Sequence, residues 1–179
     1  NLIPHTVPLS TVTQILQNLL AEGIPVKDMR TIIEALTVSK SGATDADTLT
    51  SEVRPKLGRM IVQPLLDSTG TLTVVTFAGD LENILENSFR QSNGNQVVLE
   101  PSLANSVLDA LAENATQIQE KGATPVLVVS PQLRQWLARF VRTRVRDLHV
   151  ISYTEIPEDQ KIKVFGSIGG LNAIEGKRE

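Results

Sequence analysis

Hydrophobic residues recur at steps of three and four positions from Ser10 to Gly23. The apolar members of this stretch are Val12, Ile15, Leu16, Leu19 and Leu20. Such spacing places the apolar side chains on one side of a helix. The pattern therefore predicts an amphipathic helix, with Ser10 as its N-cap and Gly23 as its stop.

Two further helical stripes follow in the first part of the chain. The first is expected to begin at Asp28, whose side chain can cap it, and to bury Met29, Ile32, Ile33 and Leu36. Residues 40–47 are small and polar and predict a loop. The second stripe repeats at steps of four, through Leu49, Val53, Leu57 and Ile61. Pro55 lies inside it and should kink this helix or mark its first turn.

A short run rich in Thr and Val, Leu72 to Phe77, predicts a strand. Asp80 is then expected to cap a helix that runs through Phe89. The polar segment from Arg90 to Asn95 interrupts the pattern. We expect a domain junction there.

Beyond this segment the pattern alternates between strand and helix. The expected strands are residues 96–99, 125–129, 148–153 and 161–167. One helix should be capped by Ser102, and another should start at Ser130 with Pro131 in its first turn. The sequence thus predicts an α+β or α/β fold, in which residues 1–90 form a mainly helical subdomain and residues 91–170 a small α/β sheet subdomain. Residues 171–179 are expected to be a flexible tail.

Composition narrows the class of protein. The 179 residues carry 17 Lys and Arg against 20 Asp and Glu, so the whole chain is not built to attract polyanions. The absence of Cys excludes disulfides, thiolate zinc sites and thiol nucleophiles. No apolar run approaches the roughly 20 residues that span a bilayer. The start at Asn1 does not resemble a signal peptide, so we expect the numbering to begin inside a longer protein.

The sequence predicts no catalytic residue and no cofactor. Ser167 follows Gly166 directly, which is not the spacing of a nucleophile elbow. Gly166, Gly169 and Gly170 have no convincing helix after them to bind phosphate. A small α/β nucleotide-binding domain or enzyme is the alternative from another class. It would need convergent polar groups at the C-terminal ends of the strands.

No metal site is predicted either. A calcium loop started at Asp45 would have Thr50 where its Gly is required and Lys56 where its Glu is required. Helix capping by Asp45 and its acidic neighbours is the favoured interpretation. His5 and His149 stand alone in the sequence, without acidic or Cys neighbours at ligand spacing.

Basic residues crowd one expected helix end and the link that follows it, at Arg134, Arg139, Arg142, Arg144 and Arg146. Three interpretations remain open: a solvated face, a protein interface and a nucleic-acid patch. The chain has only one Trp, one Tyr and four Phe, few for a single-strand binder, so nucleic acid is the least favoured. As a protein interface the cluster is Arg139, Arg142, Arg144 and Arg146, because Arg pairs well with carboxylates.

Three blocks of the sequence carry a recognisable pattern. The first, TVTQILQNLLAEGIPVKDMRTIIEAL, ends at Leu36. The second covers residues 48–63, and the third runs from Pro125 to Ile168 through VLVVSPQLRQWLARFVRTRV and HVISYTEIPEDQKIKVFGSIG. These blocks resemble those of the FlhA-like export gate family, which flagellar and virulence type III secretion systems share. Their order and spacing fit that family along nearly the whole chain.

The resemblance implies the third, mostly helical, and fourth, α/β, subdomains of a cytoplasmic region at the inner membrane of a bacterium. It implies a nonameric ring that receives export chaperones with bound substrates, ATPase-complex components and other export-gate proteins. No nucleic acid and no catalytic residue are implied, and membrane contact would come only through an N-terminal region. The chaperone cleft of the family lies on subdomains that this chain lacks.

The flagellar and virulence branches of the family share most of these blocks. The segments RTIIEAL and YTEIP favour the flagellar branch, and the virulence export gate is the alternative with the same role. Pro55 stands where relatives commonly carry a helix former, and residues 170–179 match no block of the family.

Overall fold

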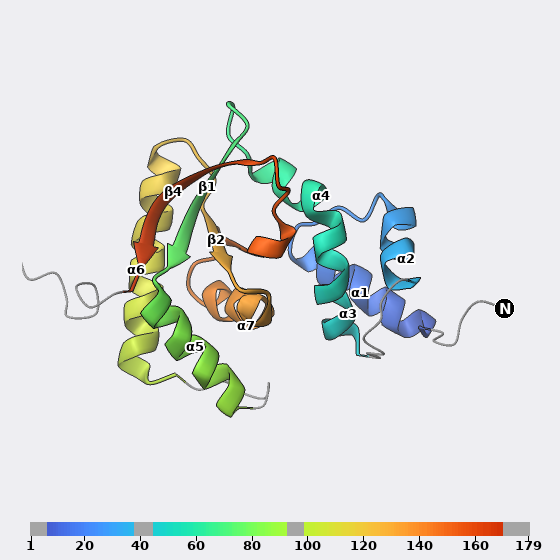
Figure 1. The fold of residues 1–179 in the computed structure, drawn as a ribbon, viewed down its shortest axis with the longest axis horizontal. Helices are drawn as coiled ribbons and strands as arrows, with labels where there is room; N and C mark the ends of the chain where they lie inside the picture. Colours follow the sequence, from blue (N-terminus) through green and yellow to red (C-terminus); the bar gives the residue numbers. More distant parts are fainter. Residues whose placement is uncertain (1–6, 38–44, 93–98, 170–179) are drawn as a thin grey trace, which may run out of the picture. The chain divides into compact units, whose positions relative to one another are not determined.

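The computed structural model describes residues 7–37, 45–92 and 99–169, which form two compact units (Figure 1). The first unit, the helical unit, comprises the chain up to Pro64 together with residues 154–157. The second, the sheet unit, comprises residues 65–153 and the chain from Glu158 onward.

The helical unit is built from short helices. They are α1 (Leu9–Ala21), α2 (Met29–Thr37), α3 (Ala46–Val53), the 3-10 helix η1 (Arg54–Leu57) and α4 (Gly58–Val62). The prediction of Ser10 as the N-cap of α1 is wrong, because Pro8 occupies that position and Ser10 lies inside the first turn. The predicted stop is confirmed: Gly23 has φ 77°, and the Ile24 amide donates to the Leu19 carbonyl.

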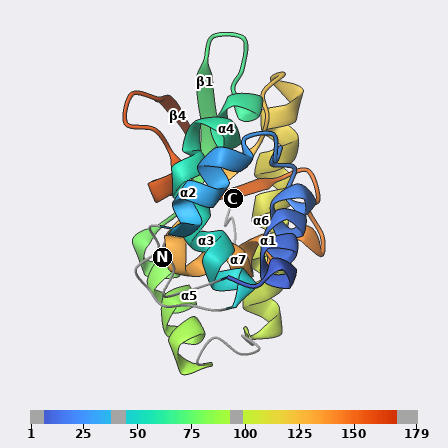
Figure 2. The ribbon, with the colours of Figure 1, turned by 90° about the vertical axis from the view of Figure 1, so that its right-hand side faces the viewer.

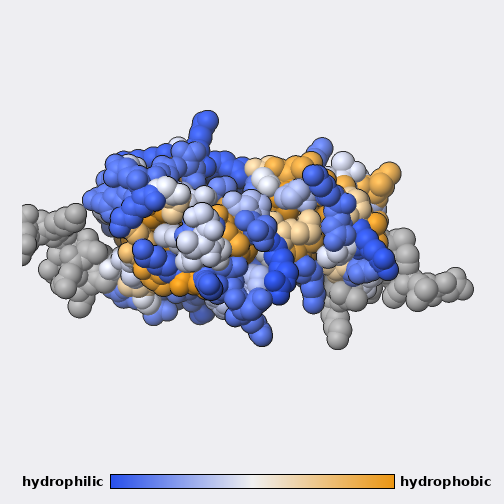
Figure 3. Space-filling model, turned by 90° about the horizontal axis from the view of Figure 1, so that it is seen from above, coloured by the Kyte–Doolittle hydropathy of each residue, from blue (hydrophilic) through white to orange (hydrophobic). Residues whose placement is uncertain are grey.

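The start of α2 was predicted correctly, whereas its buried stripe was predicted only in part: Ile32 is buried as expected and Leu36 is half-buried. The Asp28 side chain accepts a hydrogen bond of 3.1 Å from the Thr31 amide, as an N-cap does. Ile32 and Ala35 are the buried residues, while Met29 and Ile33 are exposed. The buried side of the helix is therefore narrower than the apolar stripe. Orange residues in Figure 3 mark where such apolar side chains reach the surface.

The predicted stripe from Leu49 to Ile61 is confirmed, since all its members are at most 5% exposed. Pro55 changes the helix as expected, because the chain tightens there into η1 between α3 and α4. The interpretation of Asp45 as a cap is also confirmed. Its carboxylate accepts a 2.8 Å hydrogen bond from the Thr48 amide at the start of α3.

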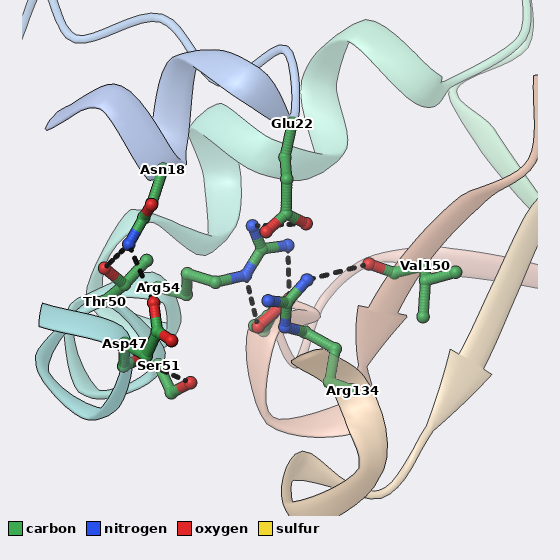
Figure 4. Close-up of polar contacts among 9 residues, drawn as sticks. Asn18, Glu22, Asp47, Thr50, Ser51, Arg54, Arg134 and Val150 are labelled. Atoms are coloured by element: carbon green, nitrogen blue, oxygen red, sulfur yellow. Dashed lines mark hydrogen bonds and ion pairs between the residues drawn. The ribbon is translucent and has the colours of Figure 1, made fainter. Parts of the chain in front are cut away.

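Polar side chains inside the helical unit form hydrogen bonds between its elements. The Asn18 amide of α1 donates to Asp47 and Thr50 of α3 (Figure 4). Arg54, only 2% exposed, forms a forked pair with Glu155, with Nε–Oε2 and Nη2–Oε1 distances of 3.0 Å each. Its Nη1 lies 3.4 Å from a carboxylate oxygen of Glu22. A charged group is thus satisfied inside the unit.

The described part of the sheet unit contains four parallel strands in the order β3-β2-β1-β4. Figure 1 labels β4, β1 and β2, and β1 and β4 are labelled again in Figure 2. The strands are β1 (Thr71–Phe77), β2 (Val126–Val129), β3 (His149–Ser152) and β4 (Lys161–Ile168). They confirm the predicted strands, except that residues 96–98 of one expected strand lie outside the described residues. The predicted fold class, helical elements followed by a small α/β sheet, is confirmed.

Three helices pack with this sheet: α5 (Gly79–Gln91), α6 (Pro101–Glu120) and α7 (Pro131–Arg142). Their core residues include Leu85, Leu111, Leu133 and Leu137, which are all fully buried. Ser130 precedes α7 and Pro131 opens it, as predicted.

Two predicted helix caps in this unit are wrong. The N-cap of α5 is Ala78, and Asp80 lies in the first turn, where it accepts from the Leu81 amide. The N-cap of α6 is Glu100, and Ser102 lies inside the helix. In both cases the helix begins one or two residues earlier than the polar residue suggested.

The division between the units does not coincide with the boundary expected at residue 90. The reason is the position of β1, which pairs with both β2 and β4 and therefore belongs in the sheet. The helix after it, α5, adds Leu81 and Leu85 to the same core. Part of the polar segment and the tail expected at residues 171–179 lie outside the described residues.

Asp67 organises the turn that leads into β1, and it gives a pH-dependent prediction. Its Oδ1 accepts hydrogen bonds from the amides of Thr69 (2.8 Å) and Thr71 (3.0 Å) and from the Thr69 hydroxyl. The hydrogen bonds from Thr69 and Thr71 hold the pKa of Asp67 below its ordinary value, and the charge of Lys163 acts in the same direction.

A lowered folded-state pKa stabilises the fold above the unfolded value of about 3.9. That stabilisation is lost as the pH falls through the folded-state pKa. We expect Asp67→Asn to lower the melting temperature at pH 7, and the difference from the unaltered protein to shrink in strong acid. Thermal unfolding across pH checks this; a difference independent of pH would contradict it.

Candidate protein-interaction surface

The end of α7 and the link after it carry the predicted basic cluster. The helix closes with main-chain hydrogen bonds from the Val145 amide to the Val141 carbonyl (2.7 Å) and from the Thr143 amide to the Phe140 carbonyl (3.3 Å). Arg139 and Arg142 lie in its last turn, where a positive charge is favourable against the helix dipole.

Apolar anchors fix the link between α7 and β3. Val145 and Leu148 are buried in the core of the sheet unit, 8% and 7% exposed. Arg144 and Arg146, on either side of Val145, point outward and are exposed. The buried side chains of Val145 and Leu148 therefore fix the backbone that carries the exposed Arg144 and Arg146.

The structure brings Arg139, Arg142, Arg144 and Arg146 to the surface of one unit, as the sequence suggested. Arg134 does not belong with them. It is only 2% exposed, and its Nη1 donates to the Val150 carbonyl at 3.5 Å, so its side chain lies in the interior of the sheet unit. Arg144 contacts Asp109 of α6, so part of its charge is neutralised within the unit.

An aromatic pair adjoins these arginines, and sequence reasoning missed it. The rings of Trp136 and Phe140 stack with centroids 5.7 Å apart, and both side chains are partly exposed. Their spacing of four residues on one helix was the signal that could have revealed the contact. We define the α7 patch as Trp136, Arg139, Phe140, Arg142, Arg144 and Arg146.

The α7 patch has the chemistry of a binding surface. Trp, Phe and Arg are the residues enriched at protein interfaces. Guanidinium groups form paired hydrogen bonds with carboxylates. Trp136 and Phe140 pack against the core of the sheet unit, and the parts of their rings that stay exposed supply apolar area. A partner suited to this patch carries acidic groups around an apolar side chain.

The other candidate site residues, Ser167 and His149, lie on different strands of the sheet. Ser167 is exposed on β4, beside Thr76 of β1. His149 starts β3, where burial lowers its pKa and the charge of Asp147 opposes that effect. His5 lies outside the described residues. In the described ranges no three His, Cys, Asp or Glu residues gather as metal ligands would.

Among the described helices, none combines the length and the apolar composition needed to cross a bilayer.

Comparison with known proteins links the chain to flagellar proteins. It is 40% identical to the flagellar biosynthesis protein FlhA of Yersinia enterocolitica over 168 residues, 93% of this chain and 24% of that protein. FlhA of Salmonella typhimurium is 36% identical over 170 residues, again 24% of its length. The chain thus spans about a quarter of the curated relatives it matches.

Solved structures share the fold. The MxiA protein of Shigella flexneri superposes with a TM-score of 0.77 at 29% identity, over 90% of this chain and 52% of that one. CdsV of Chlamydia pneumoniae gives a TM-score of 0.80 at 27% identity, over 91% and 47%. The nonameric SctV-C structure from EPEC gives 0.76 at 27% identity, over 89% and 48%.

The family assignment rests on a match along nearly the whole chain. The family model described as the FHIPEP family aligns with residues 1–161, which include the helical unit, most of the sheet unit and the α7 patch. The chain belongs to the FHIPEP family.

Proposed function

We propose that this chain is part of the cytoplasmic ring and docking platform of a bacterial flagellar type III protein export apparatus. The observation that carries the proposal is the identity of 36–40% to flagellar FlhA proteins along more than nine-tenths of the chain. The role is binding and assembly, not catalysis. The whole apparatus would include regions that this chain does not span.

Assembly into a ring is supported by the relatives of known structure. SctV-C from EPEC and the EscV cytosolic domain from a type III secretion system are nonameric, and both resemble this chain at 26–27% identity. The helical unit also exposes apolar side chains that water disfavours, at Leu9, Leu20, Met29 and Ile33. We propose the nonamer as the assembly of the complete protein.

The proposed partners are export chaperones with bound substrates, ATPase-complex components and other export-gate proteins. Complex formation by this fold is supported by the structure of CdsV with CdsO from Chlamydia pneumoniae. The proposed location is the cytoplasmic face of the bacterial inner membrane, with membrane contact through an N-terminal region. The helical and sheet units would correspond to the third and fourth subdomains of that region.

The α7 patch is proposed as one protein-binding surface, for acidic groups of a neighbouring subunit or partner. Reversing charge at Arg142 and Arg146 should weaken binding or assembly by about tenfold at low salt, because exposed charges steer association. Sedimentation at 50 and 500 mM salt measures the loss, which should diminish at high salt.

Arg90→Glu is the matched control for this test. Arg90 is an exposed arginine of α5 in the same unit, with 69% of its side chain accessible, and it lies outside the α7 patch. The control should assemble as the unaltered protein does. Equal losses in both variants, or no loss in either, would make the patch a solvated face.

Calorimetric binding of a flagellar chaperone–cargo complex tests the function itself. The complex should bind the complete protein that contains this chain, and charge reversal in the α7 patch reports whether this part contributes. A virulence export gate is the second candidate, favoured by the solved relatives MxiA and EscV. Binding of virulence chaperones instead of flagellar ones would establish it.

A further inference from the structure

An apolar groove lies in the sheet unit, away from the α7 patch. Its volume is about 330 Å³, within the range of ligand-binding pockets. Side chains from α5, α6 and the end of β4 form its walls: Leu81, Ile84, Leu103, Val107, Ala110 and Ile168. The groove is partly open to solvent, and Ile84 in its lining is 40% exposed.

The position of the groove follows from the order of the strands. β4 lies beside β1 at one side of the sheet, while the chain from β1 proceeds to β2 and β3 on the other. The C-terminal ends of β1 and β4 meet there, and the Ala78 amide donates to the Ile168 carbonyl at 2.7 Å. Open α/β sheets commonly bind ligands at this kind of switch in strand order.

The chain leaves β4 against the wall of this groove. Gly169, which lines it, has φ 103°, a conformation that L side chains rarely adopt. A Cβ at this position would lie 2.6 Å from the Cβ of Leu81, so only glycine fits between the backbone and α5. The backbone at the end of β4 therefore lies directly against Leu81, one of the residues that line the groove.

The sequence after Gly169 has the pattern that the groove requires. Leu171 and Ile174 are three residues apart, and Lys177 and Arg178 follow them. Extended chain spans at most about 3.5 Å per residue, so Leu171 is within roughly 7 Å of Gly169 and Ile174 within roughly 18 Å. Residues 170–179 lie outside the described part of the chain, and only their sequence enters here.

We propose that the groove is the binding site for residues 171–178 of the same chain, with Leu171 and Ile174 as its apolar anchors. An engineered apolar cavity of about 150 Å³ holds one benzene, so the volume of the groove suits two aliphatic side chains. Glu100 lines one end of it and offers a carboxylate to Lys177 or Arg178. The occupant would thus match the groove in apolar volume. Its charges, Lys177 and Arg178 against Glu175 and Glu179, balance overall, so only the two basic residues are suited to Glu100.

Covalent attachment favours this occupant over a free partner. A segment tethered by a short linker has an effective concentration in the millimolar range, so weak apolar contacts suffice to fill the site. A second copy of the chain could offer the same residues, but its binding would depend on protein concentration. That difference separates the two arrangements experimentally.

The chain contains no cysteine, which permits a clean cross-linking test. Ala173→Cys lies between the two anchors, and Ser106→Cys places a thiol on the groove wall. The matched control is Asn105→Cys with Ala173→Cys, since Asn105 is also exposed on α6 but does not line the groove. Oxidation of the full chain is followed by gel mobility and mass spectrometry at low protein concentration.

We expect the Ser106 pair to form an intramolecular disulfide about tenfold faster than the Asn105 pair, the ratio that burial of roughly one aliphatic side chain would give. Adding Leu171→Asp and Ile174→Asp should remove the preference while both proteins stay folded by circular dichroism. Equal rates for the two pairs would overturn the proposal. Cross-linked dimers that disappear on dilution would also overturn it, in favour of a second copy.

Discussion

Replacing Arg54 by methionine is expected to destabilise the helical unit by about 3–5 kcal/mol, the cost of breaking a buried ion pair by removing one partner. Arg54 and Glu155 are each 2% exposed and meet through two 3.0 Å contacts. Methionine fills much of the same space, but it leaves the Glu155 carboxylate without its forked donor. Urea unfolding followed by circular dichroism measures the loss.

A surface pair in the same unit supplies the matched control. Arg30 and Glu34 form an i,i+4 contact of 3.1 Å on α2, with side chains 89% and 65% exposed. Exposed pairs of this kind contribute about 0.3–0.5 kcal/mol. Arg30→Met should therefore change stability by less than about 0.5 kcal/mol. An Arg54→Met variant no less stable than this control would contradict the role assigned to the buried pair.

The double variant Arg54→Met with Glu155→Leu separates the cost of a buried carboxylate that has lost Arg54 from the cost of lost packing. Removing both charges leaves no buried carboxylate in need of Arg54, so a large part of the stability should return. Glu22, partly exposed, can be solvated after Arg54 is removed. A double variant as unstable as the single one would assign the cost to packing.

The Arg54–Glu155 pair also marks the limit of what the sequence could predict. Helical periodicity identified the stripe from Leu49 to Ile61, because local spacing determines which side of a helix is apolar. Nothing local connects two residues that are 101 positions apart. An arginine between Val53 and Pro55 reads as an exposed helical residue, whereas the fold buries it.

The same limit explains the basic cluster and the position of the domain division. Arg134 and Arg139 look alike in the sequence, but one side chain is buried and the other exposed, because they lie on different sides of α7. The polar segment after Arg90 is a true interruption of the pattern. It does not separate the units, since pairing of β1 in the sheet is a long-range contact that composition does not report.

Gly58→Ala is the second substitution with a large expected effect, and it acts on the same segment. A Cβ at Gly58 would lie 2.4 Å from the Glu155 carbonyl oxygen and 3.3 Å from its carbon. Both are backbone atoms, so no side-chain rotation relieves the contact. Residues 154–157, which belong to the helical unit, would have to shift.

Two opposing effects decide whether Gly58→Ala raises or lowers the free energy of unfolding. Gly58 has helical angles, φ −49° and ψ −47°, and opens α4, so alanine there gains up to about 1 kcal/mol of helix propensity. Overpacking against a fixed backbone costs about 1–3 kcal/mol or more. Displacing Glu155 would in addition weaken its pair with Arg54. We expect the steric term to dominate, with a net loss of about 2 kcal/mol in urea unfolding.

Gly79→Ala provides the control, because Gly79 also opens a helix, α5, and has no atom within 4 Å of an added Cβ. That variant should be neutral or slightly stabilised. Arg54→Met in the Gly58→Ala background should cost less than it does alone, since both act through Glu155 and contacting residues are not additive. Strict additivity would show that the glycine and the ion pair hold residues 154–157 independently.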